Sequence, residues 1–170
     1  MPGFGGAPLG NLFQPIADDD ARLLIRHAYA SGIRYFDTAP HYGQGMSEHR
    51  VGAALRDFPR DSYFLSTKVG RLLTPSSEAP KSQNGYVDVL PFVQHYDYTH
   101  DGVLRSLEDS LQRLGLARVD IALLHDVNPR WHGERYEERF REAMDGGYRA
   151  LERLRAEGVA DYAPMPGSAS

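Results

Sequence analysis

The feature that most constrains the fold is a regular alternation of strand-like and helix-like segments along most of the chain. Short apolar segments typical of strands fall at 3–7, 33–37, 63–67 and 119–124. Segments with apolar residues at helical spacing fall at 18–32, 47–56, 99–114 and 136–157. Consecutive strand–helix units require right-handed crossovers, which place the strands in one parallel sheet. The sequence therefore predicts an α/β fold built from about four β/α units.

Capping residues indicate where the helices begin and end. Asp18 is predicted to cap the first helix, in which Leu24, Ile25 and Ala28 share one apolar face. Thr99 is predicted to open the third helix. Glycines, which favour helix ends, close three of the helices at Gly32, Gly115 and Gly158.

One long segment, 71–98, shows no sustained periodicity and contains three prolines together with several Ser and Gly residues. Connections inside compact domains are usually much shorter than this. We therefore expect the segment to be irregular, as a functional lid or a disordered loop.

Two architectures fit consecutive β/α units, a doubly wound sheet and a β/α barrel. The only glycine cluster, at 3–6, is not a GxGxxG motif opening a helix, because about a dozen residues separate it from Asp18. That weakens the doubly wound interpretation. A TIM-type barrel usually needs about 250 residues and eight units. The prediction is a parallel TIM-barrel-type fold, truncated to a half-barrel of about four β/α units.

Composition excludes several classes of function. The chain of 170 residues has no cysteine, which excludes disulfides and thiolate chemistry, and its 7 histidines lack metal-ligand spacing. The net charge of -4 comes from interleaved acids and bases without a basic run, so no nucleic-acid partner is expected. No apolar run approaches the roughly 20 residues that span a bilayer, so no membrane partner is expected. A cytoplasmic protein is predicted.

Polar residues follow three consecutive predicted strands where each strand ends. Asp37, Lys68 and His125 take these positions, and Tyr42 lies in the glycine-flanked loop that follows Asp37. Because parallel strands end at one edge of the sheet, where barrel enzymes place catalysis, we expect these side chains to lie together. A phenol exchanges protons poorly at neutral pH unless a cation favours the phenolate. Lys68 is that candidate cation.

The remaining members complete a possible acid/base set. Asp37 can keep Lys68 charged in a partly dry pocket, and His125 can orient a substrate oxygen. Singly, each residue has an ordinary structural role as well: a cap for Asp37, a solvated side chain for Lys68, and packing or strand-end hydrogen bonding for Tyr42 and His125. Their joint placement favours proton transfer to a carbonyl or hydroxyl group.

Three blocks, FDTAPHYGQGMSE, LSTKVGR and VDIALLHD, resemble the signature motifs of the aldo/keto reductase superfamily. Together with GFGGAPLGNLF they resemble the branch that contains D-threo-aldose (L-fucose) 1-dehydrogenases and pyridoxal 4-dehydrogenases. The resemblance covers about residues 3–159. It implies that Tyr42 is the proton donor or acceptor, that Lys68 stabilises its phenolate, that Asp37 pairs with Lys68, and that His125 orients the substrate.

The resemblance also implies the cofactor and the substrate class. An NADP or NAD nicotinamide is expected near Gly5, Gly6 and Ala7, with Asp37 close to its ribose. Hydride would pass between this cofactor and an aldose, alcohol or aldehyde. Aromatic loop residues are candidate walls of the substrate pocket, with loop packing as the alternative: Tyr86, Phe92, Tyr96, Tyr98 and Trp131.

The chain departs from the family pattern after the last predicted helix. Residues 1–159 resemble the amino-terminal half of a barrel roughly twice this length, whereas 160–170 read as a disordered, linker-like tail that cannot form a buried strand. A half-barrel has open sheet edges, which favour self-association or pairing with another half-barrel. An inactive truncated fragment and a non-catalytic interaction module are the alternatives to an active oxidoreductase.

Overall fold

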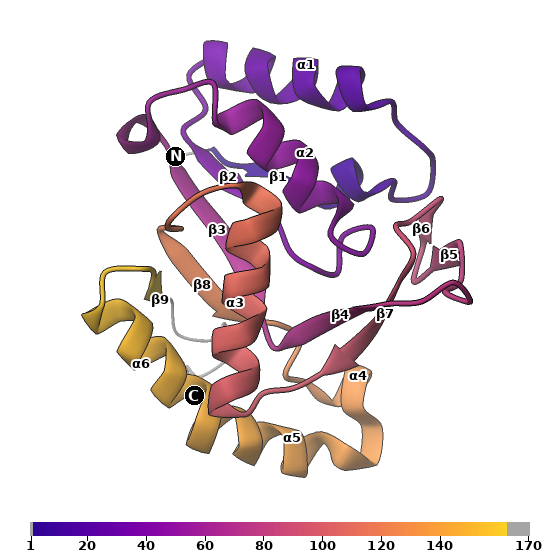
Figure 1. The fold of residues 1–170 in the computed structure, drawn as a ribbon, viewed down its shortest axis with the longest axis vertical. Helices are drawn as coiled ribbons and strands as arrows, with labels where there is room; N and C mark the ends of the chain where they lie inside the picture. Colours follow the sequence, from indigo (N-terminus) through magenta and orange to yellow (C-terminus); the bar gives the residue numbers. More distant parts are fainter. Residues whose placement is uncertain (1, 163–170) are drawn as a thin grey trace.

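The computed structural model describes residues 2–162, and its centre is one parallel sheet of five strands. The strands are β1 (Phe4–Gly5), β2 (Tyr35–Asp37), β3 (Phe64–Val69), β8 (Ile121–Leu124) and β9 (Asp161–Tyr162). They lie side by side in chain order, and each neighbouring pair is parallel (Figure 1). A doubly wound sheet reverses its strand order at a switch point, whereas a β/α barrel adds strands in sequence. The predicted barrel-type α/β fold is therefore confirmed.

Helices cover the sheet on the side that carries its apolar residues. They are α1 (Asp18–Ala30), α2 (Met46–Leu55), α3 (His100–Leu114), α4 (Pro129–His132), α5 (Tyr136–Glu142) and α6 (Tyr148–Ala156). Short 3-10 helices occur at η1 (Ala7–Gly10), η2 (Arg60–Ser62) and η3 (Gly133–Arg135). Helix α3 packs on β3 and α6 packs on β9, as Figure 1 shows.

The fourth predicted helix is interrupted. The sequence predicts one helix over 136–157, but the chain forms α5, a π-helical turn at Ala143–Gly147 (η4), and then α6. At Gly146 of this turn a Cβ would lie only 2.7 Å from the backbone nitrogen of His100. The turn thus brings the helix against the start of α3. The prediction of a continuous helix is therefore wrong, because periodicity within one helix does not reveal such a contact.

The predictions made for α1 and for the start of α3 have different outcomes. The cap of α1 is Ala17, which has extended backbone, and Asp18 is instead the first helical residue, paired with Arg50 through a 2.8 Å bond. Leu24 is 49% exposed and does not share the buried face of Ile25 and Ala28. The prediction for Thr99 is confirmed, since its hydroxyl accepts a hydrogen bond from the Gly102 nitrogen at 3.1 Å.

The segment expected to be irregular forms antiparallel strands. Strand β4 (Arg71–Pro75) pairs with β7 (Phe92–Tyr96), and β5 (Ser82–Gln83) pairs with β6 (Tyr86–Val87). This hairpin extends from the end of β3, with β5 and β6 at its tip (Figure 1). Its partners lie far apart in sequence, so local periodicity could not show the pairing. The expectation of an irregular loop is therefore wrong for these strands.

The first residues of the expected tail belong to the sheet. Strand β9 pairs with β8 in parallel, with Asp161 opposite Ile121 and Tyr162 opposite Ala122. The expectation that the tail from residue 160 onward cannot form a strand is therefore wrong for Asp161 and Tyr162. The part of that tail at 163–170 lies outside the described residues.

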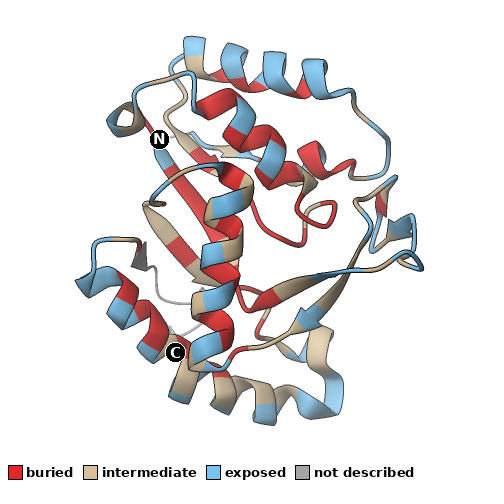
Figure 2. Cartoon of the chain, in the orientation of Figure 1, coloured by how far each residue is buried: buried red, intermediate tan, exposed pale blue. Residues whose placement is uncertain are grey.

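The core lies between the sheet and the helices. Figure 2 shows buried residues concentrated on the strands, on α2 and on the sheet-facing side of α3, while the outer side of α1 is exposed. Alternation along β2 puts Phe36 into this core and leaves Tyr35 and Asp37 partly buried on the opposite face. Phe64, which pairs with Tyr35 on that opposite face, is 58% exposed. One face of the sheet therefore stabilises the fold and the other carries polar side chains.

Replacing Leu107 with alanine is expected to lower the free energy of unfolding by about 2–5 kcal/mol, because a fully buried leucine leaves a cavity when truncated. Leu107 lies in α3 and is 1% exposed within the core. Denaturant unfolding followed by circular dichroism measures the change. Leu24→Ala is the matched control, with an expected effect below about 0.5 kcal/mol. Equal losses for the two variants would contradict the placement of the core.

Candidate active site

The predicted residues meet at the carboxyl edge of the parallel strands. Asp37 ends β2, Lys68 is the penultimate residue of β3, and His125 directly follows β8. The His125 nitrogen donates to the Val69 carbonyl at 3.0 Å, which extends the ladder between β3 and β8. Three neighbouring strands therefore bring the polar groups of three distant sequence blocks to one edge.

An ion pair forms the base of the site. The Lys68 Nζ lies 2.6 Å from the Asp37 Oδ2 and donates a second bond to the Thr38 carbonyl at 3.1 Å. The Ser66 hydroxyl donates to the other carboxylate oxygen of Asp37 at 2.6 Å, and the Tyr35 hydroxyl lies 2.9 Å from the Ser66 hydroxyl. The carboxylate is held from two sides, so the ammonium group of Lys68 has a fixed position.

Lys68 stays charged beside the ring of Tyr42. Its Nζ lies 4.7 Å from the centre of the Tyr42 ring. Burial acts to lower the pKa of Lys68, but the carboxylate of Asp37 and the phenolate form of Tyr42, both of which favour the ammonium ion, outweigh it, and the net result is a raised pKa. The site therefore presents an ammonium ion to a phenol at neutral pH.

Tyr42 is positioned by a close approach of two backbone segments. A Cβ at Gly10 would lie 2.4 Å from the Tyr42 carbonyl carbon, and one at Gly43 would lie 2.4 Å from the Gly10 oxygen. Gly43 also has a positive φ of 68°. Only glycines permit both the contact and the turn. The loop 39–45 thus packs against the end of η1 and places the phenol over the edge of the sheet.

A buried carboxylate fixes the helix that follows this loop. Glu48 in α2 is fully buried, and its two oxygens accept bonds from Thr67 Oγ1 and Arg113 Nε, each at 2.6 Å. These bonds connect α2 to β3 and α3. The position of Tyr42 relative to Lys68 therefore depends on a buried ion pair as well as on backbone contacts.

His125 faces the phenol and is uncharged at neutral pH. Its ring lies perpendicular to the Tyr42 ring, with centroids 6.1 Å apart. Burial first, and then the positive charges of Arg71 and Lys68, hold the pKa of His125 well below its ordinary value. Within residues 2–162 its buried Nδ1 has no hydrogen-bond partner, and its Nε2 lies 3.4 Å from the Asp126 Oδ2.

Three functional candidates were missed by reasoning from the sequence. His41, Arg71 and Asp126 lie beside the four predicted residues, and His41 is 5.6 Å from the His125 ring. Each is a near neighbour in sequence of a predicted residue. That adjacency is the only sequence signal, and it does not distinguish a site residue from a packing residue.

The predicted cofactor-binding glycines lie next to Asp37. Gly5 pairs with Asp37 in the sheet, and a Cβ there would meet nothing within 4 Å. The Gly6 nitrogen donates to the Asp37 carbonyl at 2.7 Å, and a Cβ on Gly6 would collide with that oxygen. Ala7 begins η1. The space over Gly5 is therefore open, whereas Gly6 must be a glycine because of its contact with the Asp37 carbonyl oxygen.

Two of the five aromatic candidates reach the site. Tyr86 stacks on Tyr42 with centroids 6.0 Å apart, and Trp131 lies 5.5 Å from the His41 ring. Tyr98 is fully buried, and its hydroxyl bonds to the His125 carbonyl at 2.6 Å, so it supports the site from behind. Tyr96 packs against Tyr98.

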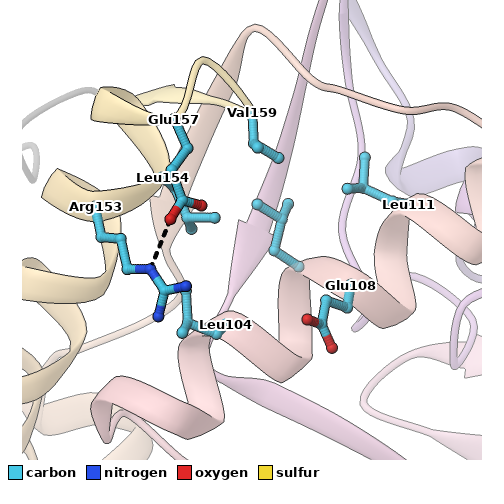
Figure 3. A pocket seen from close by; sticks show the side chains of 8 residues that line it. Leu104, Glu108, Leu111, Arg153, Leu154, Glu157 and Val159 are labelled. Carbon is cyan, nitrogen blue, oxygen red and sulfur yellow. Dashed lines mark hydrogen bonds and ion pairs between the residues drawn. The ribbon is translucent and has the colours of Figure 1, made fainter.

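The fifth candidate, Phe92, contributes to a surface hollow with α2 residues such as Met46 and His49. Another hollow, between α3 and α6, is lined by Leu104, Leu111, Leu154 and Val159, with the Arg153–Glu157 ion pair at its rim (Figure 3). Its volume of about 160 Å³ is below the ~300 Å³ at which small-molecule pockets usually begin. Neither hollow contains any of the four predicted residues.

The sequence blocks that build this edge match a known family model, that of the aldo/keto reductase family, over residues 3–163. The chain belongs to the aldo/keto reductase family. The resemblance inferred from the three motifs is therefore confirmed.

Individual relatives agree with this assignment to the aldo/keto reductases. A D-threo-aldose 1-dehydrogenase of a Pseudomonas species is 42% identical over 92% of this chain and 46% of its own length. A pyridoxal 4-dehydrogenase of Microbacterium luteolum is 42% identical over 92% of this chain and 48% of its own length. The holo form of an aldo-keto reductase from Bacillus halodurans superposes with a TM-score of 0.67, at 28% identity, over 94% of this chain and 44% of that one. The chain thus spans about half the length of the curated relatives it matches.

Among residues 2–162 no helix combines the length and apolar character needed to cross a bilayer. Within the same residues no group of three or more His, Cys, Asp or Glu side chains is placed to hold a metal ion.

Proposed function

We propose that this chain carries the proton-transfer site of an NAD(P)-dependent oxidoreductase acting on an aldose, alcohol or aldehyde. The observation that carries the proposal is the position of the charged Lys68. Its Nζ lies 2.6 Å from the Asp37 carboxylate and 4.7 Å from the centre of the Tyr42 ring. This arrangement favours exchange of the phenolic proton, which an isolated tyrosine exchanges slowly at neutral pH.

Each residue of the site has a defined part in that chemistry. Tyr42 gives its hydroxyl proton to the substrate carbonyl during reduction and takes the substrate hydroxyl proton during oxidation. Lys68 stabilises the phenolate, and Asp37 keeps Lys68 in place. The uncharged His125 directs a ring nitrogen at the substrate oxygen. The bound nicotinamide supplies or accepts the hydride.

The substrate proposal rests on the two relatives at 42% identity, whose names give an aldose and pyridoxal as substrates. Gly5, Gly6 and Ala7 with Asp37 are the residues proposed to hold the nicotinamide end of the cofactor, and the choice between NADP and NAD stays open. A cytoplasmic location and the lack of nucleic-acid partners stay predictions.

A second candidate role is pairing with another chain. In the described sheet, β1 and β9 each have a neighbour on one side only, and the exposed Phe64 lies on the face away from the helices. Unpaired strand edges and exposed apolar side chains favour association. The alternatives to an active oxidoreductase are an inactive truncated fragment and a non-catalytic interaction module.

Calorimetric titration with oxidised and reduced NAD and NADP, beside light scattering, tests the proposal. Saturable binding of one cofactor with micromolar affinity is the expected result, and the scattering mass reports whether the binding species is a monomer or an assembly. A folded chain that binds none of the four nucleotides would contradict the oxidoreductase proposal and favour the alternative.

Replacing Gly5 with valine is expected to weaken NAD(P) binding at least tenfold, equivalent to about 1.4 kcal/mol. The added side chain would fill the open space beside Asp37 in which the nicotinamide is proposed to lie. The same titration measures the Kd. Ala17→Val, at an exposed extended position before α1, is the matched control. If Gly5→Val binds as tightly as this control, the nicotinamide lies elsewhere.

A further inference from the structure

A buried cation lies beside the proposed catalytic residues. Arg71, the first residue of β4, is 2% exposed, and its guanidinium group forms an ion pair with Asp126. It lies 4.7 Å from the ring centres of both Tyr96 and Trp131. Because Asp126 directly follows His125, this ion pair ties the hairpin to the end of β8.

The same guanidinium group contacts the imidazole of His41. Arg71 Nη1 lies 3.0 Å from His41 Nδ1 and 3.0 Å from Gln94 Oε1, and that oxygen is also 3.0 Å from His41 Nδ1. His41 therefore has one ring nitrogen fixed by two polar groups. Among residues 2–162 no hydrogen bond reaches its other nitrogen, Nε2.

The His41 ring lies at the centre of the aromatic residues of the site. It makes perpendicular contacts with the rings of Tyr86, His125 and Trp131 at 5.3, 5.6 and 5.5 Å. The Tyr42 ring is 6.3 Å away. A molecule that contacts both the Tyr42 hydroxyl and the His125 ring therefore comes within reach of His41.

We infer that His41 is a specificity-determining residue: an uncharged imidazole, held by Arg71, that hydrogen-bonds a substrate hydroxyl close to the reacting carbon. The inference rests on the proposed oxidoreductase function and narrows its substrate to polyhydroxy compounds such as aldoses. Unsubstituted aldehydes lack the group that His41 would recognise.

The chemistry of the contact explains why a hydroxyl is the partner. A neutral imidazole offers one donor and one acceptor, and which nitrogen holds the proton depends on whether Nδ1 accepts from Arg71 or donates to Gln94. A hydroxyl group can donate or accept, so it matches Nε2 in both tautomers. The positive charge of Arg71 is already balanced by Asp126, so the cluster offers no free cation for an anionic substrate.

The electrostatic surroundings keep His41 uncharged. Burial first, and then the charge of Arg71, lower the pKa of His41 to about 4, with a smaller contribution in the same direction from Lys68. The hydrogen bond with Gln94 and the charge of Asp126 act in the opposite direction. His125, Tyr42 and Tyr86 also face the ring and are the remaining titratable neighbours named by its ring contacts.

Histidine titration by NMR tests the part of the inference that concerns Arg71, without any need for turnover. The His41 signal, assigned by its loss in His41→Asn, is expected to titrate with a midpoint near pH 4. Arg71→Gln should raise that midpoint by at least one pH unit, whereas Asp126→Asn should lower it. Unfolding would move the His41 midpoint of both variants toward the ordinary pKa of histidine, so midpoint shifts in opposite directions identify the charge effect. A wild-type midpoint near 6.5, or equal midpoints in the variants, would overturn the role of Arg71.

Binding of a neutral hexose tests the role of His41 itself. Hexose added to the labelled full chain without cofactor, so that no turnover follows, should shift the His41 signal, and His41→Phe should weaken hexose affinity at least fivefold. Propanal, which has no second hydroxyl, should bind the two proteins alike. Hexose affinity unchanged by His41→Phe, or no hexose-induced shift at His41, would overturn the inference. Failure of the proposed function appears separately, as a lack of cofactor binding in calorimetry with the histidine midpoints unaffected.

Discussion

Tyr42→Phe is expected to reduce kcat/KM by about 10²–10⁴-fold, because positioned general acid/base groups contribute that much to proton transfer. Only the hydroxyl beside Lys68 is lost, and the ring that stacks on Tyr86 remains. Turnover is followed through nicotinamide absorbance with an aldose as substrate.

Tyr86→Phe is the matched control for this variant. It removes the hydroxyl of the neighbouring stacked ring, and we expect it to change kcat/KM less than threefold. Both variants should retain the wild-type Kd for the cofactor. A Tyr42→Phe protein that turns over aldose at the wild-type rate would remove Tyr42 from the proton-transfer step.

Acidification from pH 7 to pH 4 is expected to destabilise the folded chain by several kcal/mol. His41 has its pKa lowered from 6.5 to about 4 by burial and by Arg71, and His125 shifts in the same direction. Below pH 6.5 the unfolded chain binds protons at these positions and the folded chain does not, so stability falls as pH falls. For His41 alone, about 2.5 pH units at about 1.4 kcal/mol each give roughly 3 kcal/mol.

The measurement is urea unfolding at half-unit pH steps, compared between wild type and His41→Asn. The wild-type protein should lose about 3 kcal/mol more than the variant between pH 6.5 and 4. This is a large share of a typical domain stability of about 5–15 kcal/mol. Parallel pH dependence of the two proteins would show that His41 titrates normally in the folded state.

The strand-end residues could be predicted from sequence because of a simple geometric rule. Asp37, Lys68 and His125 each follow an apolar strand, and parallel strands end at one edge, so their proximity follows from topology. The structure places Asp37 and Lys68 in direct contact, and the Tyr42 ring lies near both Lys68 and His125. The roles of these residues in catalysis stay predictions.

The rest of the site depends on contacts that no local pattern records. Arg71 contacts His41 across 30 positions of sequence and Asp126 across 55. The pairing of β4 with β7 and the close approach of Gly10 to Gly43 are likewise long-range. Periodicity alone places Arg71 at the start of a loop. Only the structure shows that its guanidinium group is buried between two aromatic rings.

The hairpin at the site is joined to the sheet region through a narrow neck, the pairing of Arg71 with Tyr96. Arg71 opens β4 two residues after β3 ends and pairs with Tyr96, the last residue of β7, so the chain leaves the sheet region and returns to it at one point. Residues 76–91 lie beyond that neck. Changes in their length or sequence can therefore leave Lys68 and the Arg71–Asp126 pair in place, but Tyr86, which stacks on the Tyr42 ring, links this segment to the proposed proton-transfer residue.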